Sequence, residues 1–227
     1  MVAIFVVLMI LVFLGIDAWM QRRQARRAAV AGGDLRAVVR LPKVRLLKGL
    51  FYAPNHLWIR VEPDGRARLG VDDFAPKLLG HVDAIEAVQP GTAVRKGQPL
   101  LRLRQGDRVI VLRAPVSGRV LRVNEDLLKN PQLLKDDPYL QGWVLEVEPD
   151  DLGRTASKLL VAERAANWLR REGQRLREFL GEALLARPQV GVTMADGGLP
   201  AEGVLSHLDE QAWRECQARF FTSYETE

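Results

Sequence analysis

The first twenty residues form one nearly unbroken apolar stretch. Residues 2–20 contain twelve Val, Ile, Leu or Phe residues, and Asp17 is their only charged residue. At helical rise this stretch covers about 28 Å, close to the hydrocarbon thickness of a bilayer. Asp17 lies near the end of the span, where its carboxylate can reach the headgroup layer, and Trp19 suits an interface position. The pattern predicts a transmembrane helix over residues 1–20.

The next segment, residues 21–48, shows no sustained period and predicts a basic juxtamembrane linker. It holds nine Lys or Arg residues and one acid, Asp34. Because positive charge marks the cytoplasmic side, we expect the N-terminus outside and the remaining chain in the cytoplasm. A cleaved signal peptide fits less well, since no positive charge precedes the apolar run. The residues expected to attract anionic membrane lipid, or to act only as a topology signal, are Arg22, Arg23, Arg26 and Arg27.

Short alternating stretches replace these patterns in residues 49–150. Apolar residues are interspersed with polar or small ones in three short stretches, which are separated by turns rich in Gly, Pro, Asp and Ser. The stretches are Leu57–Val61, Ala67–Val71 and Arg119–Val123. Several short strands at this spacing predict a small sandwich or barrel.

A helical period follows in residues 154–227. Leu and Ala residues recur three, four or seven positions apart from Leu159 to Leu184. Gly173 interrupts the period, so either one bent helix or two short helices fit. We expect the apolar face to pack on the strand domain, with another protein as the alternative partner. Residues 196–200 predict a turn, and Asp209 opens a last helix with one broad apolar face. That face carries Trp213, Cys216, Phe220 and Phe221.

Charge and residue counts narrow the function classes. The net charge is +5, but residues 49–227 hold 24 basic and 26 acidic residues, so the excess lies in the linker. A nucleic-acid footprint needs positive charge spread over the domain, so no nucleic acid is expected as a partner. Three His and one Cys show no metal-ligand spacing, so no metal is expected. Cys216 fits a buried inert thiol. No nucleophile elbow, phosphate loop or carboxylate pair indicates an enzyme, and His81, Asp83 and Glu86 fit a solvated loop.

An ordered series of motifs resembles the glycine cleavage H-protein family over about a hundred residues. The matching segments are His56-Leu57-Trp58, Gly70-Val71-Asp72-Asp73-Phe74-Ala75, Leu79-Gly80-His81-Val82, Pro90-Gly91, Lys96-Gly97, Ala114–Gly118, Val123-Asn124-Glu125, Asn130-Pro131, Asp137-Pro138-Tyr139 and Gly142-Trp143. The resemblance implies an α+β fold with a barrel-sandwich hybrid, the lipoyl- or biotinyl-like β domain. It does not cover the anchor, the linker or residues 154–227, which add a transmembrane helix and a helical appendage.

The family carries a lipoyl group on a lysine at the tip of a β-hairpin, and this arm transfers an aminomethyl group between enzymes. Counted back from Pro115 without a gap, Asp107 occupies the position of that lysine. Gly106-Asp107 suits a two-residue turn, and no lysine lies between Lys96 and Lys129. An arginine cannot replace the acylated amine because its guanidinium stays protonated. The resemblance with this departure implies no lipoyl cofactor.

Three functions follow from these observations. The first is a non-lipoylated, membrane-tethered scaffold or adaptor. Its hairpin would offer a charged surface to an unidentified protein partner through Arg102, Arg104, Gly106, Asp107 and Arg108. The simpler interpretation of Asp107 is that it only forms the turn. The second is a working lipoyl carrier in glycine cleavage. The third is a lipoyl-like adaptor of an export system, which would lie on the other side of the membrane. Fold alone does not choose among them.

Overall fold

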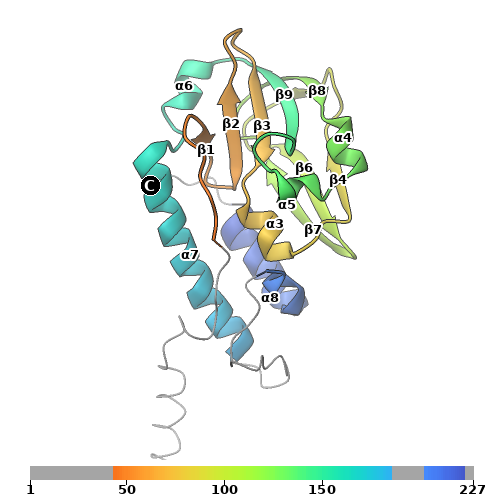
Figure 1. The fold of residues 1–227 in the computed structure, drawn as a ribbon, viewed down its shortest axis with the longest axis vertical. Coiled ribbons are helices and arrows are strands. Elements are labelled where there is room, and N and C mark those ends of the chain that lie inside the picture. The colour runs from red at the N-terminus through yellow and green to blue at the C-terminus, as the bar shows by residue number, and fades with distance from the viewer. Residues whose placement is uncertain (1–42, 186–201, 223–227) are drawn as a thin grey trace, which may run out of the picture.

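A computed structural model describes residues 43–185 and 202–222 of this chain (Figure 1). Two antiparallel sheets form its centre. The larger has six strands in the order β1-β2-β3-β9-β8-β5, and the smaller has three in the order β4-β6-β7. The strands are β1 Phe51–Tyr52, β2 Leu57–Val61, β3 Ala67–Val71, β4 Ala84–Ala87, β5 Ala93–Val94, β6 Pro99–Gln105, β7 Arg108–Arg113, β8 Gly118–Val123 and β9 Trp143–Pro149.

Short helices connect the strands and longer ones follow them. The helices are α3 Phe74–Leu79, α4 Glu125–Lys129, α5 Leu133–Asp136, α6 Leu152–Ala156, α7 Ala162–Leu185, η1 Val204–His207, α8 Glu210–Cys216 and the π-helical turn η2 Gln217–Phe221. In Figure 1, α7 runs along one side of the sheets and α4 lies on the opposite side. This α+β arrangement of two sheets confirms the β part of the predicted fold class. The predicted transmembrane helix lies outside the described residues, and within them no helix is long and apolar enough to cross a bilayer.

One hydrophobic core joins the sheets to the C-terminal helices. Leu103 of β6, Leu145 of β9, Leu176 of α7 and Phe221 of η2 belong to the same buried cluster. The helical extension therefore packs on the strand domain, as the sequence predicted. Helix α7 continues through Gly173 as a single helix, because Leu176 and Leu180 in the core hold the turns that follow.

Trp58 anchors a second cluster with Tyr52, Tyr139 and Trp168. Its indole is fully buried, and its Nε1 donates to the carbonyls of Val71 and Pro138 at 3.1 Å. A Cβ added at Gly70 would lie 2.4 Å from this indole, so only glycine fits there. Trp143 is only half-buried, and the guanidinium groups of Arg68 and Arg122 each lie 5.1 Å from its ring centroid.

The last part of the predicted linker, residues 43–48, lies against the folded domain. The backbone N–H of Arg45 donates to Asp73, and Lys77 Nζ donates to the carbonyl of Lys43 at 2.6 Å. The hydroxyl of Tyr139 donates to the carbonyl of Arg45. Sequence composition gave no sign of this attachment, because its hydrogen bonds use the backbone of the segment.

Candidate functional site

The hairpin formed by β6 and β7 holds the residues that the sequence selected. Leu101, Leu103, Ile110 and Leu112 point into the core, which fixes the register of the two strands. Gly106 and Asp107 form the turn between them, as predicted, and Gly106 takes a positive φ of 55°. The N–H of Gly106 donates to Asp83 Oδ2 at 2.7 Å, so the loop before β4 holds the tip in place.

The tip presents a carboxylate to solvent. Asp107 is exposed, and its neighbours Gly106 and Arg108 carry no primary amine. An arm linked through an amide bond needs an accessible amine, and the chain has no lysine from residue 97 to residue 128. The residues at this tip therefore do not fit a lipoyl group.

Arg102 and Arg104 lie on the outer face of β6 and share one carboxylate, Glu86 on β4. Glu86 Oε1 is 2.6 Å from Arg104 Nη2, and Glu86 Oε2 is 3.6 Å from Arg102 Nη1. The hydrogen bond from Arg104 lowers the pKa of Glu86 below its usual value. All three side chains remain about half exposed, so water screens the pairs strongly. This outer face is open to a partner.

Arg108 lies apart from these arginines and faces the C-terminal extension. Its Nη1 donates to the carbonyl of Leu205 at 2.7 Å, and its Nη2 donates to the carbonyl of Leu208. Its guanidinium also lies 5.0 Å from the ring centroid of Trp213. The five residues predicted to form one charged surface are thus divided between an open face and a covered one.

We call residues 202–222 the C-terminal cap, because they cover this side of the hairpin. The N–H of Gly203 donates to the carbonyl of Lys77 at 2.9 Å, and Glu202 pairs with Lys135 at 2.8 Å. A Cβ added at Gly80 would lie 2.8 Å from the Cα of Gly203, so the two backbones touch. Asp209 caps α8 by accepting from the N–H of Ala212, as the predicted helix start required.

Beneath α3 and α7, the structure brings together charged groups that sequence reasoning did not assemble. His56 is fully buried at a positive φ of 64°, and its Nδ1 lies 2.9 Å from Asp72 Oδ2. Its ring stacks on Phe74 at 4.0 Å, and its Nε2 has no hydrogen-bond partner among the described residues. The contact with Asp72 and the stacking on Phe74 hold the His56 ring inside the packed interior, which favours a structural role. In the sequence, the only sign of this cluster is that His56, Asp72 and Phe74 belong to motifs of the family resemblance.

Glu172 on α7 is a second buried acid in this region. Only 3% of it is exposed, and burial raises the pKa of its carboxyl above the usual value, while His56 and Arg175 oppose that rise. Arg175 Nη1 lies 2.8 Å from Glu172 Oε2. Burial likewise raises the pKa of Asp73, partly offset by hydrogen bonds from Lys77 and the Arg45 N–H. Asp73 joins segments distant in sequence through the Arg45 N–H, whereas Glu172 pairs with Arg175 within α7.

The remaining candidates show no arranged chemistry. Cys216 is buried, as predicted, and burial raises the pKa of its thiol to about 12. His81 and Asp83 are exposed neighbours at 3.5 Å, whereas Glu86 turns to the arginines. Residues 43–185 and 202–222 contain no group of His, Cys, Asp and Glu that could hold a metal ion. The membrane-surface residues Arg22, Arg23, Arg26 and Arg27 lie outside the described residues.

Comparison with known proteins identifies relatives of the β domain. The family model described as glycine cleavage H-protein matches residues 50–172, more than half of the chain. The chain is 32% identical over 133 residues to the probable glycine cleavage system H protein of Pyrococcus abyssi, which covers 59% of this chain and 98% of that protein. It is 37% identical over 119 residues to the glycine cleavage system H protein of Geobacillus thermodenitrificans, covering 52% of this chain and 92% of that protein.

A solved structure gives the same picture. The crystal structure of a glycine cleavage system H protein from Mycobacterium marinum aligns with a TM-score of 0.50 and 27% sequence identity, and the match covers 56% of this chain and 99% of that one. The family match ends at Glu172, so the second half of α7 and the whole C-terminal cap lie beyond it.

Proposed function

This chain belongs to the glycine cleavage H-protein family, and we propose that it is a member without a lipoyl arm that works as a membrane-tethered scaffold or adaptor facing the cytoplasm. The observation that carries the proposal is the turn of the β6–β7 hairpin. The hairpin is intact, but its two turn residues are Gly106 and Asp107. A carboxylate cannot accept an acyl group as an amide, so no covalent arm can be attached at this position.

The C-terminal cap supports a binding role for the hairpin. A carrier hairpin has to present its arm to successive enzymes, which requires free space around the tip. Here Arg108, next to the tip, donates to two carbonyls of the cap and packs on Trp213. One face of the hairpin is therefore already occupied by the chain itself, and a partner is left the face of Arg102, Arg104 and Glu86.

The membrane tether rests on the sequence. The apolar residues 2–20 and the basic residues that follow support a single-pass anchor with the globular part inside. This arrangement brings the β domain to the membrane surface, where it serves as a subunit or adaptor of a membrane-associated complex.

Glycine cleavage itself is the second candidate, and the comparisons favour it. The matched relatives named above are glycine cleavage system H proteins, and the chain covers nearly their whole length. Under this alternative the chain would carry an aminomethyl group on a lipoyl arm held at a lysine elsewhere.

Intact mass spectrometry of the full chain purified from its native cell tests the lipoyl question. We expect no lipoyl adduct on the wild type. The variant Asp107→Lys, co-expressed with a lipoate ligase, should gain one lipoyl group at residue 107, because it restores an exposed amine to the turn. Asp64→Lys, in the exposed β2–β3 turn, is the matched control and should stay unmodified. An adduct on any lysine of the wild type would replace the scaffold proposal with a carrier function.

Membrane fractionation and a topology reporter fused after Glu227 test the tether. The full chain should stay with membranes, a chain lacking residues 2–20 should be released, and the reporter should be active only on the cytoplasmic side. A reporter active on the outer side would instead favour the export adaptor.

Partner capture from detergent-solubilised membranes tests the open face. Arg102→Ala with Arg104→Ala should reduce capture of the co-purifying protein, because an acidic partner loses both cations. Arg164→Ala with Arg171→Ala, two exposed arginines on α7, makes the same charge change elsewhere. Equal capture by both double variants would remove the hairpin from the interface.

A further inference from the structure

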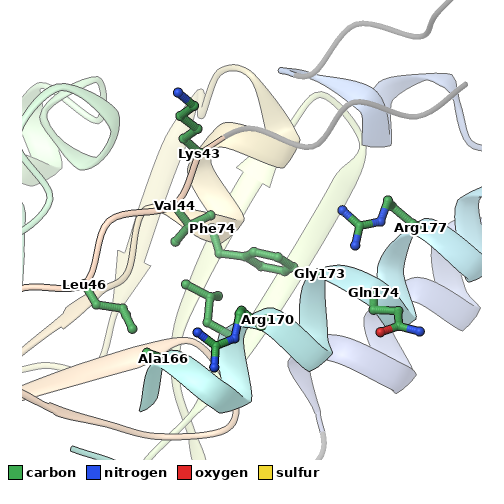
Figure 2. Close-up of a pocket in the computed structure, with 10 residues that line it drawn as sticks. Lys43, Val44, Leu46, Phe74, Ala166, Arg170, Gly173, Gln174 and Arg177 are labelled. Atoms are coloured by element: carbon green, nitrogen blue, oxygen red, sulfur yellow. The ribbon is translucent and has the colours of Figure 1, made fainter. Parts of the chain in front are cut away.

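A cleft of about 650 Å³ lies between residues 43–46 and α7 (Figure 2). Its size falls in the range of small-molecule sites. The floor is apolar and is made by Val44, Leu46, Phe74 and Leu169. Figure 2 shows the ring of Phe74 directed toward α7 near Gly173, which adds no side chain at this point.

Three cations line the same cleft. They are Lys43 on the entering chain and Arg170 and Arg177 on α7. Nearby cations are paired, since Lys77 binds Asp73 and Arg175 binds Glu172. By contrast, none of the three lining cations forms an ion pair with any residue in 43–185 or 202–222. Arg170 donates to the neutral amide oxygen of Asn167.

An apolar floor with unpaired cations at its edge suits a ligand that has an acyl part and an anionic part. A purely ionic ligand would leave the floor hydrated, and a purely apolar ligand would leave three cations without a counterion. The apolar floor buries hydrocarbon at a gain proportional to its area, and basic residues near a bilayer attract anionic lipid.

The position of the cleft identifies the source of such a ligand. Lys43 lies at the rim of the cleft, and the chain that leads from the predicted anchor and the basic linker arrives there. The chain from the predicted tether therefore enters the described domain beside this cleft.

We propose that the cleft between residues 43–46 and α7 binds an anionic phospholipid, with its phosphate on Arg170 and Arg177 and the start of an acyl chain against Phe74 and Leu169. This inference rests on the proposed membrane tether, which it deepens by giving the β domain a defined orientation at the bilayer. Phosphatidylglycerol is the probe.

The experiment uses the full chain labelled at one introduced cysteine and mixed with vesicles that contain a fluorescence-quenching lipid. Cys216 is buried and stays unlabelled under native conditions. Glu178→Cys places the dye on α7 beside the cleft, and Glu125→Cys places it on α4 across the molecule (Figure 1). Both substitutions remove one exposed acid, so the labels are matched in charge.

With phosphatidylglycerol in the vesicles, the dye at residue 178 should be quenched more than the dye at residue 125. Arg170→Gln with Arg177→Gln should raise the mole fraction of phosphatidylglycerol needed for half-maximal quenching of the dye at residue 178 about tenfold or more. Arg164→Gln with Arg171→Gln, the charge-matched pair outside the cleft, should leave it within about twofold.

Equal quenching of both dyes, equal effects of the two arginine pairs, or equal quenching with phosphatidylcholine alone would each overturn the lipid site. Displacement by a soluble polyglutamate peptide would overturn it in favour of an acidic protein segment. Retention of the full chain on phosphatidylcholine vesicles tests the tether in a separate measurement. A chain not retained there that still needs Arg170 and Arg177 for phosphatidylglycerol supports the cleft and contradicts the anchor.

Discussion

Arg104 and Arg108 stand on the two strands of one hairpin, close to the same turn, yet their surroundings differ in kind. Arg104 pairs with Glu86 where both side chains are about half exposed. Arg108 donates to the backbone carbonyls of Leu205 and Leu208 and lies over Trp213. An exposed ion pair is screened by water and salt, whereas a partly buried guanidinium bonded to carbonyls is costly to remove. Of these two arginines, Arg104 therefore belongs to an open surface, whereas Arg108 attaches the C-terminal cap to the hairpin.

The two faces also differ in whether residues outside the family match cover them. The face with Arg104 belongs to the β domain, which matches the family. The face with Arg108 is covered by the C-terminal cap, which lies beyond the family match. Because the cap covers one face, the hairpin has one open face. The substitutions below test whether the two faces contribute as differently to stability as their contacts indicate.

The largest effect is expected from Trp213→Ala. Trp213 is 6% exposed and belongs to the main core, so its removal should lower the free energy of unfolding by about 3–5 kcal/mol. Urea denaturation measures the loss, and hydrogen exchange should show faster exchange in β7. Glu215→Ala, on the exposed side of α8, is the control and should change little. A loss below about 1 kcal/mol would mean that the cap is only loosely attached.

Gly80→Ala tests the contact between α3 and the cap. Gly80 has a φ of +84°, and a Cβ there would lie 2.8 Å from the Cα of Gly203. Gly65 has nearly the same φ, +85°, but a Cβ there meets nothing within 4 Å, so Gly65→Ala isolates the backbone strain of about 1–2 kcal/mol. We expect Gly80→Ala to cost about 1–3 kcal/mol more than this control in thermal or urea unfolding. Equal losses would show that the cap moves aside freely.

Arg108→Ala against Arg104→Ala compares the two faces directly. Loss of the Arg108 guanidinium removes a donor from two carbonyls, of which that of Leu205 keeps the N–H of Leu208, and should lower the free energy of unfolding by about 1.5–3 kcal/mol. Arg104→Ala should have a clearly smaller effect that disappears in high salt, because it breaks only the exposed pair with Glu86. The measurement is urea denaturation at low and high salt. Equal effects of the two variants would erase the distinction between the faces.

The smallest effect is expected from Glu172→Gln, and it depends on pH. Burial raises the pKa of Glu172 in the folded state, so the folded chain binds this proton more tightly than the unfolded chain. Stability from this group is therefore lost as pH rises from the usual glutamate pKa to the raised value. His56 and Arg175 oppose the shift, and Asp72 adds to it. Glu172→Gln should be more stable than the wild type at neutral pH and less dependent on pH. If the wild type instead gained stability relative to the variant as pH rises above the usual glutamate pKa, the raised pKa of Glu172 would be contradicted.

Much of the fold could be predicted because local patterns encode it. Alternation in Leu57–Val61 and Arg119–Val123 marks strands that the structure contains, and Gly106-Asp107 marks the turn between β6 and β7. Asp209 marks the start of α8, whose N-cap bond needs only residues three positions apart. The continuity of α7 could not be predicted, because core contacts of Leu176 and Leu180 decide it.

Neighbouring residues are enough to predict the order of the elements, the ordered family motifs and the lack of a lysine around the hairpin tip. Long-range packing sets Arg108 against the cap and leaves Arg104 toward solvent, because the carbonyl of Leu205 that Arg108 binds is 97 residues away. It also decided that His56, Asp72 and Glu172 are buried together, and that residues 43–46 meet α7 in a basic cleft. Burial and charge environment come from long-range packing, which no local period specifies.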